Sequence, residues 1–481
     1  MHEIITLQFG QAANFVGTHF WNAQETYFTY DGQDESLVDH DVHWRGGEGA
    51  HGEETFTPRV LIYDLRGGFG SMKKINEMYE AYEEKDPLSL WGGQQSSYIH
   101  EQVPKNQYQQ HLDSGAPADL EKQLLSTETV KVWSDFNRIY YHPRSLKQLN
   151  GYDADGGIDP FDSYLKGKEL YEKLEHDHGV FDSDFRPLLE EADQLQGVNV
   201  LTGTRDGWGG FSASYLEILR DEMPKMTIHT YGLEGPESSE ADKHDIKKLQ
   251  PEYSFTQAFN SIHETSTLYT PLTLPLSTPR HLNGFNLQSQ WHTSALLALA
   301  IENITLPTRL RRETAVLRMT GLAARANWRG QQKINQLELY APLQQAAEVD
   351  RRNILRWGWA SADIPGESTF GTMAVFRGVD GETAADELMQ SLETRTAPLT
   401  NKLIQKTQSP LPDSFPYLFD KVDGVATYTS LKTSTLARHR LKSMVGVVKM
   451  CMPRGDDRDE MVNGLEDIRE AYELEDEDDY Q

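Results

Sequence analysis

The sequence predicts an α/β protein built around a doubly wound, mostly parallel sheet. Short apolar runs typical of buried strands alternate with segments whose apolar residues recur at helical spacing. Glycine-containing turns follow three of these runs and precede helices, as in folds whose parallel strands are joined by crossover helices. A long helix that is apolar on most faces then leads into a mixed region, which predicts a second, smaller α+β domain.

The first unit of the sheet is a strand over residues 4–9, a turn at Gly10 and a helix with an apolar stripe. The other segments expected in the sheet domain follow the same alternation. They are strands at 59–64, 198–202 and 226–231 and helices at 165–174 and 212–222. Two polar, glycine-containing stretches, residues 31–58 and 85–128, predict long loops.

The change of pattern along the chain predicts four regions. Residues 1–288 form a nucleotide-binding-type domain, and residues 289–305 form the central linking helix. Residues 306–455 form the second domain, with strand candidates at 337–340, around Val375 and at 445–448. Residues 456–481 are rich in acids and predict a disordered tail.

Composition limits the partners of this chain. It has 481 residues and a formal net charge of −28, which opposes direct binding to nucleic acid or to anionic lipid. No run approaches the roughly 18 apolar residues of a transmembrane helix. The first residues lead directly into a strand, without the features of a secretory signal or a mitochondrial presequence. We therefore expect protein partners and a location in the cytoplasm or on the cytosolic face of an organelle.

The candidate site consists of the three glycine-containing turns, because ligands of such sheets bind at the carboxyl ends of the strands. Glycines let the backbone approach phosphate, and helix N-termini offer free N–H groups. The candidate residues are Gly10, Gln11 and Asn14 in the first turn, Asp64, Gly67 and Gly68 in the second, and Thr204, Gly207, Gly209 and Gly210 in the third. Ordinary strand–turn–helix packing, or an N-cap role for Asp64, explains the same residues equally well.

Two other groups of side chains are interpreted as solvated surface. His40, His43 and His51 lie in a polar segment, and we expect no metal there. Arg309, with Arg311 and Arg312, is expected at a solvated helix end. No Gly-x-Ser-x-Gly elbow, Walker A loop or kinase motif is present, so the residues indicate no catalytic group.

Several motifs resemble tubulin. Gly10-Gln11-x-x-Asn14-x-x-Gly17 resembles its opening loop, residues 60–68 its second nucleotide loop, and the segment from Gly210 through Pro224 the helix after its glycine-rich signature. Residues 90–93, 132–136 and 141–145 are absent from tubulin and resemble the Misato family of tubulin-like proteins. The resemblance implies a tubulin-like fold on a Rossmann-like GTPase scaffold, with GTP or GDP as the ligand of the ancestral site.

The chain departs from tubulin where nucleotide chemistry is concentrated. Tubulin's glycine-rich turn corresponds to residues 204–210, in which Thr204, Arg205, Asp206 and Trp208 replace glycines. Tubulin's Gly-x-x-Asn hydrolysis motif has no counterpart after the central helix. These changes predict a degenerate GTP-binding site without GTPase activity.

Three functions remain open at this stage. The resemblance implies a non-enzymatic factor in mitochondrial distribution and mitochondrial DNA inheritance, acting from the cytosolic face of the mitochondrion and in the cytoplasm. The alternatives are a GTP-binding, filament-forming tubulin-like GTPase and an accessory protein of tubulin or microtubules.

Overall fold

A computed structural model gives the structure of the chain. It describes residues 2–29, 35–49, 52, 54–74, 76, 103–115, 124–235, 247–273, 279, 281–311, 317–327, 330–343, 349–359, 368–393, 399–420 and 424–473. The expected motif at residues 90–93 lies outside these residues. Within them, no helix combines the length and the apolar character needed to cross a membrane.

A six-stranded parallel sheet forms the larger part of the molecule, in the order β5-β4-β1-β6-β7-β8. Its strands are β1 (Ile4–Phe9), β4 (Val60–Arg66), β5 (Leu146–Asp153), β6 (Gly197–Gly203), β7 (Thr227–Glu234) and β8 (Leu268–Thr273). In β4, Val60 and Ile62 belong to one hydrophobic core and Leu61 and Tyr63 to another. Both faces of this strand are therefore buried, as parallel sheets require.

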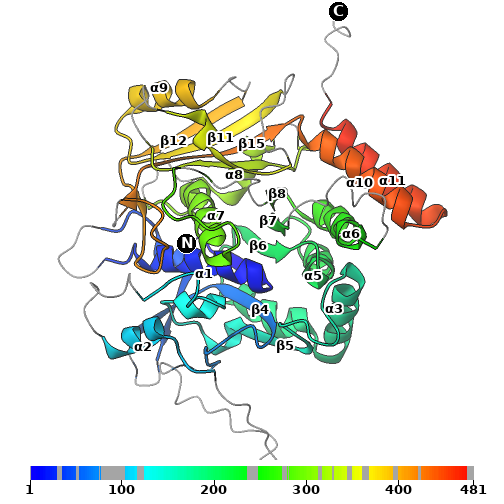
Figure 1. Ribbon diagram of the computed structural model, residues 1–481, viewed down its shortest axis with the longest axis horizontal. Coiled ribbons are helices and arrows are strands. Elements are labelled where there is room, and N and C mark those ends of the chain that lie inside the picture. The colour runs from blue at the N-terminus through cyan, green and yellow to red at the C-terminus, as the bar shows by residue number, and fades with distance from the viewer. Residues whose placement is uncertain are drawn as a thin grey trace, which may run out of the picture.

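Helices cover the two faces of this sheet (Figure 1). On one face lie α1 (Gln11–Glu25) and α7 (Gln290–Thr305), which pack against each other. On the other lie α3 (Tyr164–His178), α5 (Gly207–Glu222) and α6 (Gln250–Thr265). Shorter helices are α2 (Gln107–Ser114) and α4 (Arg186–Glu190), with single turns at Trp133–Phe136 and Pro143–Ser145.

The second sheet has five strands in the order β10-β9-β15-β11-β12. They are β9 (Gln336–Tyr340), β10 (Leu355–Trp357), β11 (Thr369–Arg377), β12 (Leu399–Gln405) and β15 (Thr427–Ser434); only β11 and β12 pair in parallel. Helix α8 (Met319–Ala326) contacts β11, and α9 (Glu382–Leu392) follows β11 in the chain. A minor pair joins β13 (Ser409–Pro410) to β14 (Gly424–Val425).

Three predictions about this architecture are wrong. The stretch 31–58 is not only loop, because β2 (Trp44–Glu48) and β3 (Glu54–Pro58) form a hairpin within it. Residues 445–448 are not a strand but part of α10 (Ala437–Cys451). Four consecutive residues of valine and glycine suggested a strand, whereas the longer apolar spacing of the whole segment is helical.

The acidic tail is the third correction. Residues 456–470 form helix α11 (Asp456–Glu470) rather than a disordered segment. Leu465 and Tyr472 are completely buried. Helices α10 and α11 pack against α6, which lies on the large sheet.

Candidate functional site

The three predicted turns meet at one edge of the large sheet. Strands β4, β1 and β6 are adjacent and parallel, so the turns after them lie side by side. Gln11 is the first residue of α1, and Gly67 adopts a positive φ of 88° in the second turn. Thr204 is fully buried, and its side-chain hydroxyl donates to the Leu233 carbonyl at 3.2 Å. The structure therefore brings the candidate residues to a common face.

Asp64 is enclosed by donors from the protein itself. Its Oδ2 accepts hydrogen bonds from Asn14 Nδ2 and from Trp133 Nε1, each at 2.9 Å. Its Oδ1 accepts from the Leu65 backbone N–H, also at 2.9 Å, and the residue is 1% exposed. Burial raises the pKa of Asp64, while these hydrogen bonds act in the opposite direction. Both carboxylate oxygens are thus engaged by groups of the folded chain.

Trp208 lies directly against Gly10. A Cβ atom on Gly10 would be 2.4 Å from Trp208 Nε1, so only glycine fits beneath this ring. The indole also packs against Phe161 and Phe211, with ring centroids 5.3 and 5.8 Å away. An aromatic side chain therefore covers the glycine at which a phosphate loop would need open space.

Asp206 caps the helix that would bind phosphate. It is the N-cap of α5, and its Oδ1 accepts from the Trp208 backbone N–H at 3.0 Å. Free N–H groups at a helix N-terminus attract anions, and here a carboxylate of the chain takes that place. A phosphate brought to this helix end would meet a like charge.

The buried Asp206 carboxyl should make the stability of the protein depend on pH. Burial raises its pKa to about 6, above the ordinary value of 3.8. Between these values the folded state holds the proton more tightly than the unfolded state, so this group's contribution to stability falls as pH rises through 6. Relative to wild type, Asp206→Asn should therefore be roughly 1–2 kcal/mol more stable at pH 8 than at pH 4.5. Urea unfolding at the two pH values measures the difference.

Asp206→Ala provides the matched comparison for that measurement. It should show the same pH trend, but lie about 1 kcal/mol below Asp206→Asn at both pH values because it loses the helix cap. Equal offsets of Asp206→Asn from wild type at pH 4.5 and pH 8 would contradict the assignment.

The glycines of the third turn serve helix packing. A Cβ on Gly210 would be 1.9 Å from the Tyr164 carbonyl oxygen, and one on Gly209 would be 2.8 Å from the Ala258 Cβ. A Cβ on Gly207 would be 2.6 Å from the ring of Phe161. These positions thus allow α3 and α6 to approach α5 closely, a role that requires glycine without any ligand.

Arg205 is directed to a different set of contacts. Its guanidinium forms an ion pair with the buried Glu252 and lies 5.9 Å from the centre of the Phe255 ring. Arg440 of α10 also forms an ion pair with Glu252, and its guanidinium lies 5.0 Å from the centre of the Phe255 ring. The arginine that could have offset a phosphate charge thus takes part in fixing α6 and α10 instead.

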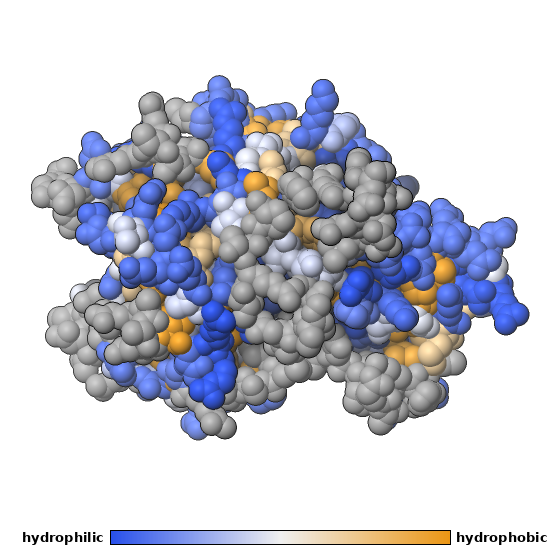
Figure 2. Space-filling view, turned by 90° about the horizontal axis from the view of Figure 1, so that it is seen from above, coloured by the Kyte–Doolittle hydropathy of each residue, from blue (hydrophilic) through white to orange (hydrophobic). Residues whose placement is uncertain are grey.

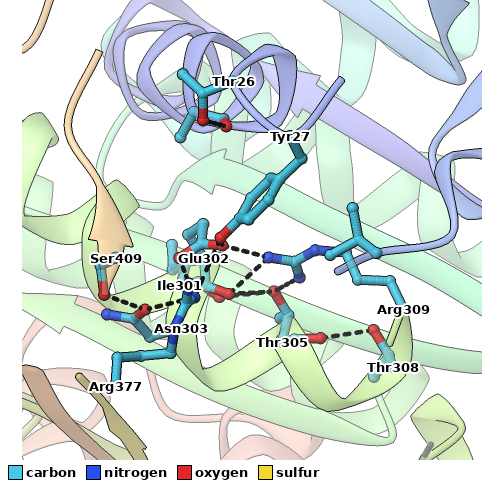
Figure 3. Close-up of polar contacts among 12 residues, drawn as sticks. Thr26, Tyr27, Ile301, Glu302, Asn303, Thr305, Thr308, Arg309, Arg377 and Ser409 are labelled. Carbon is cyan, nitrogen blue, oxygen red and sulfur yellow. Dashed lines mark hydrogen bonds and ion pairs between the residues drawn. The ribbon is translucent and has the colours of Figure 1, made fainter. Parts of the chain in front are cut away.

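A buried polar network lies at the C-terminal end of the central helix α7 (Figure 3), next to the segment where tubulin carries its hydrolysis motif. Glu302 of α7 accepts from the Tyr27 hydroxyl and from Arg309 Nη2, each at 2.6 Å, and lies 3.5 Å from Arg377 Nη1. Burial raises the pKa of Tyr27 above its ordinary range, which keeps this phenol protonated as a donor. Asn303 extends the network to Ser409, whose hydroxyl donates at 2.7 Å.

Arg309 corrects the prediction of a solvated helix end, because it is 1% exposed and paired with Glu302. Arg311 is exposed, and Arg312 lies outside the described residues. Sequence reasoning missed Glu302, Arg377 and Tyr27. One signal was present, since Glu302 is a lone carboxylate after a long apolar run and such a residue requires a buried cation.

The histidines give a second correction. His43 is not solvated but 1% exposed, and its ring packs edge-to-face against those of Phe20 and Trp21, with centroids 5.5 and 5.8 Å away. His51 lies outside the described residues. Across the part of the chain that the structure describes, no three His, Cys, Asp or Glu side chains converge to hold a metal ion.

Comparison with known proteins gives consistent matches along the chain. The family described as Misato Segment II tubulin-like domain matches residues 2–114, and the family described as Tubulin domain matches residues 122–310. A protein named DML1 from Gibberella zeae is 38% identical over 496 residues, covering 98% of this chain and 97% of that protein. A dml1 protein from Aspergillus oryzae is 38% identical over 501 residues, covering 98% of each. A DML1 protein from Yarrowia lipolytica is 28% identical over 509 residues and the full length of both chains.

Proposed function

The chain belongs to the Misato family of tubulin-like proteins, and from that premise we propose that it acts through protein contacts, without hydrolysing GTP. Its role in this proposal is the distribution of mitochondria and the inheritance of mitochondrial DNA, exerted from the cytosolic side, as the resemblance to the Misato family implies. The observation that carries the non-enzymatic part is the Trp208 ring lying against Gly10.

Three features of the site support the proposal. Trp208 covers the first turn, the Asp206 carboxylate caps the helix of the third turn, and Asp64 is held by Asn14 and Trp133. One group at each of the three turns, Gly10, Asp64 and Asp206, is thus in contact with other parts of the fold. Near the segment where tubulin carries its hydrolysis motif, Glu302 and Arg309 form a buried ion pair with each other.

Nucleotide titration tests this part of the proposal. We expect the purified, nucleotide-stripped chain to show no binding of GTP or GDP with magnesium tighter than the millimolar range, or about −4 kcal/mol, by isothermal calorimetry. Dissociation constants in the micromolar range, or about −8 kcal/mol, would instead favour the GTP-binding alternative. Measured GTP turnover above the background rate would likewise overturn it.

A cellular experiment tests the mitochondrial part. Depleting the protein should disturb the distribution of mitochondria and the transmission of their DNA, as scored by microscopy and by the fraction of cells that lose mitochondrial DNA. Re-expressed Gln11→Ala should restore both as well as wild type does, because this partly exposed residue belongs to the first turn of a site that the proposal treats as inactive. Normal mitochondria after depletion would refute the mitochondrial role. If wild type restores the mitochondria but Gln11→Ala does not, the result would favour a function that depends on bound nucleotide.

A further inference from the structure

One face of helix α10 is basic and exposed. The helix buries the side that carries Leu441, Met444, Val445 and Val448. On the opposite side, His439, Lys442, Gly446 and Lys449 are exposed, and their spacing of three or four residues places them on one stripe. A Cβ on Gly446 would meet no atom within 4 Å, so the middle of this stripe is open. We call these four residues, with the half-buried Arg438 beside them, the α10 basic face.

The cations of the α10 basic face have no carboxylate partner among the described residues. Arg440, on the buried side, is paired with Glu252. Of the seven acids of the neighbouring α11, two pair within their own helix, Glu466 with Arg469 and Asp459 with Arg458. Figure 2 shows that the projecting α10–α11 hairpin presents a mainly hydrophilic surface. Unpaired basic residues are notable in a chain whose net charge is −28.

The described part of the chain ends close to this face. Helices α10 and α11 pack together as a hairpin with a short connection at residues 452–455, so the end of α11 lies near the start of α10. The end of α11 is fixed, because the Gln332 side-chain amide donates to the Ala471 carbonyl at 2.9 Å. The buried Tyr472 hydroxyl accepts from the Ile334 backbone N–H at 2.7 Å.

We propose that the acidic segment 474–481 docks on the α10 basic face of the same molecule. This segment, beyond the described residues, contains five consecutive acids from Glu475 to Asp479. Eight residues in an extended conformation span about 26 Å, and the fifteen-residue helix α10 is about 22 Å long, so the segment reaches the whole face. Exposed ion pairs are individually weak and screened by salt, but the covalent connection gives the segment a high effective concentration.

Zero-length cross-linking tests the docking in the full chain. A carbodiimide joins carboxylates directly to amines, and we expect cross-links from residues 475–479 to Lys442 and Lys449, identified by mass spectrometry. Their yield should fall about tenfold at 1 M salt, where screening reduces the Debye length to about 3 Å. Mixing isotopically heavy and light copies distinguishes contacts within one molecule from contacts between molecules.

A competition measurement provides a second test. A labelled peptide of eight glutamates should bind the chain lacking residues 474–481 about tenfold more tightly at low salt than it binds the full chain, because the segment no longer competes. The double variant Lys442→Glu/Lys449→Glu should lose this binding, whereas Lys168→Glu on α3, which changes a lysine outside this face with a 42% exposed side chain, should retain it. Circular dichroism verifies that each variant is folded.

The proposal is overturned by any of three results. The first is that cross-links to the α10 basic face are no more frequent than those to Lys168. The second is that about half of the cross-links in an equal mixture join a heavy copy to a light copy, as random intermolecular pairing requires. The third is equal affinity of the glutamate peptide for the full and shortened chains.

Discussion

Replacing Glu302 with alanine is expected to destabilise the protein by about 3–5 kcal/mol, because the change leaves two buried guanidinium groups without their carboxylate. Arg309 and Arg377 are 1% and 0% exposed, and Glu302 is the acid that both of them contact. The loss is a large share of the roughly 5–15 kcal/mol by which folded proteins are stable. Urea unfolding followed by tryptophan fluorescence measures it.

A matched control separates this effect from ordinary loss of a surface charge. Glu172 of α3 is 60% exposed and lies 3.9 Å from Lys168, so Glu172→Ala should change stability by no more than about 0.5 kcal/mol. If Glu302→Ala is as mild as Glu172→Ala, the network does not stabilise the contact between the central helix and the second sheet. Arg377 belongs to β11 of that sheet, so unfolding of the two domains should become less cooperative in Glu302→Ala.

Gly210→Ala should destabilise the protein by about 3 kcal/mol or more, and Gly167→Ala by a similar amount, since both force atoms into a closely packed contact. The added Cβ would lie 1.9 Å from the Tyr164 carbonyl in the first variant and 1.6 Å from the Gly207 carbonyl in the second. Both clashes are with backbone, so α3 and α5 must move apart to relieve them. Thermal or urea unfolding without added nucleotide detects the change.

Gly446→Ala is the control for these two substitutions. Gly446 also lies inside a helix, but its added Cβ would contact nothing, and alanine should leave stability unchanged or raise it by about 0.5–1 kcal/mol. A Gly210→Ala variant as stable as wild type would show that this glycine is not needed for packing. The interpretation of the third turn as a phosphate loop would then regain support.

The tubulin-like α/β fold predicted from the sequence is confirmed. Strand β1, the turn at Gly10 and helix α1 were identified because a period of two or of 3.6 residues is a property of local sequence. The adjacency of the three turns also followed from sequence, since the carboxyl ends of parallel strands share one edge. Membership of the Misato family was indicated by motifs in a fixed order, and the matches along nearly the whole chain agree with it.

Other features depended on contacts between distant segments. The sequence around Asp206 and Trp208 suggested a damaged phosphate loop, but the fold decides that Trp208 lies on Gly10 and that Asp206 caps α5. Arg309 looked like a solvated cation, and only the packing of α7 against the second sheet places it beside Glu302. Whether a charged side chain is buried depends on which distant segments pack over it, and the local spacing of residues does not determine those contacts.

The end of the chain shows the same division. Its sequence determined a high density of acids, which is a property of composition. The tertiary structure decided that residues 456–470 are helical, because the apolar side of α11 packs against α10 and α6. Composition predicts disorder when a segment cannot bury apolar area by itself. A complementary surface elsewhere in the chain supplies that burial, and Leu465 and Tyr472 become fully buried.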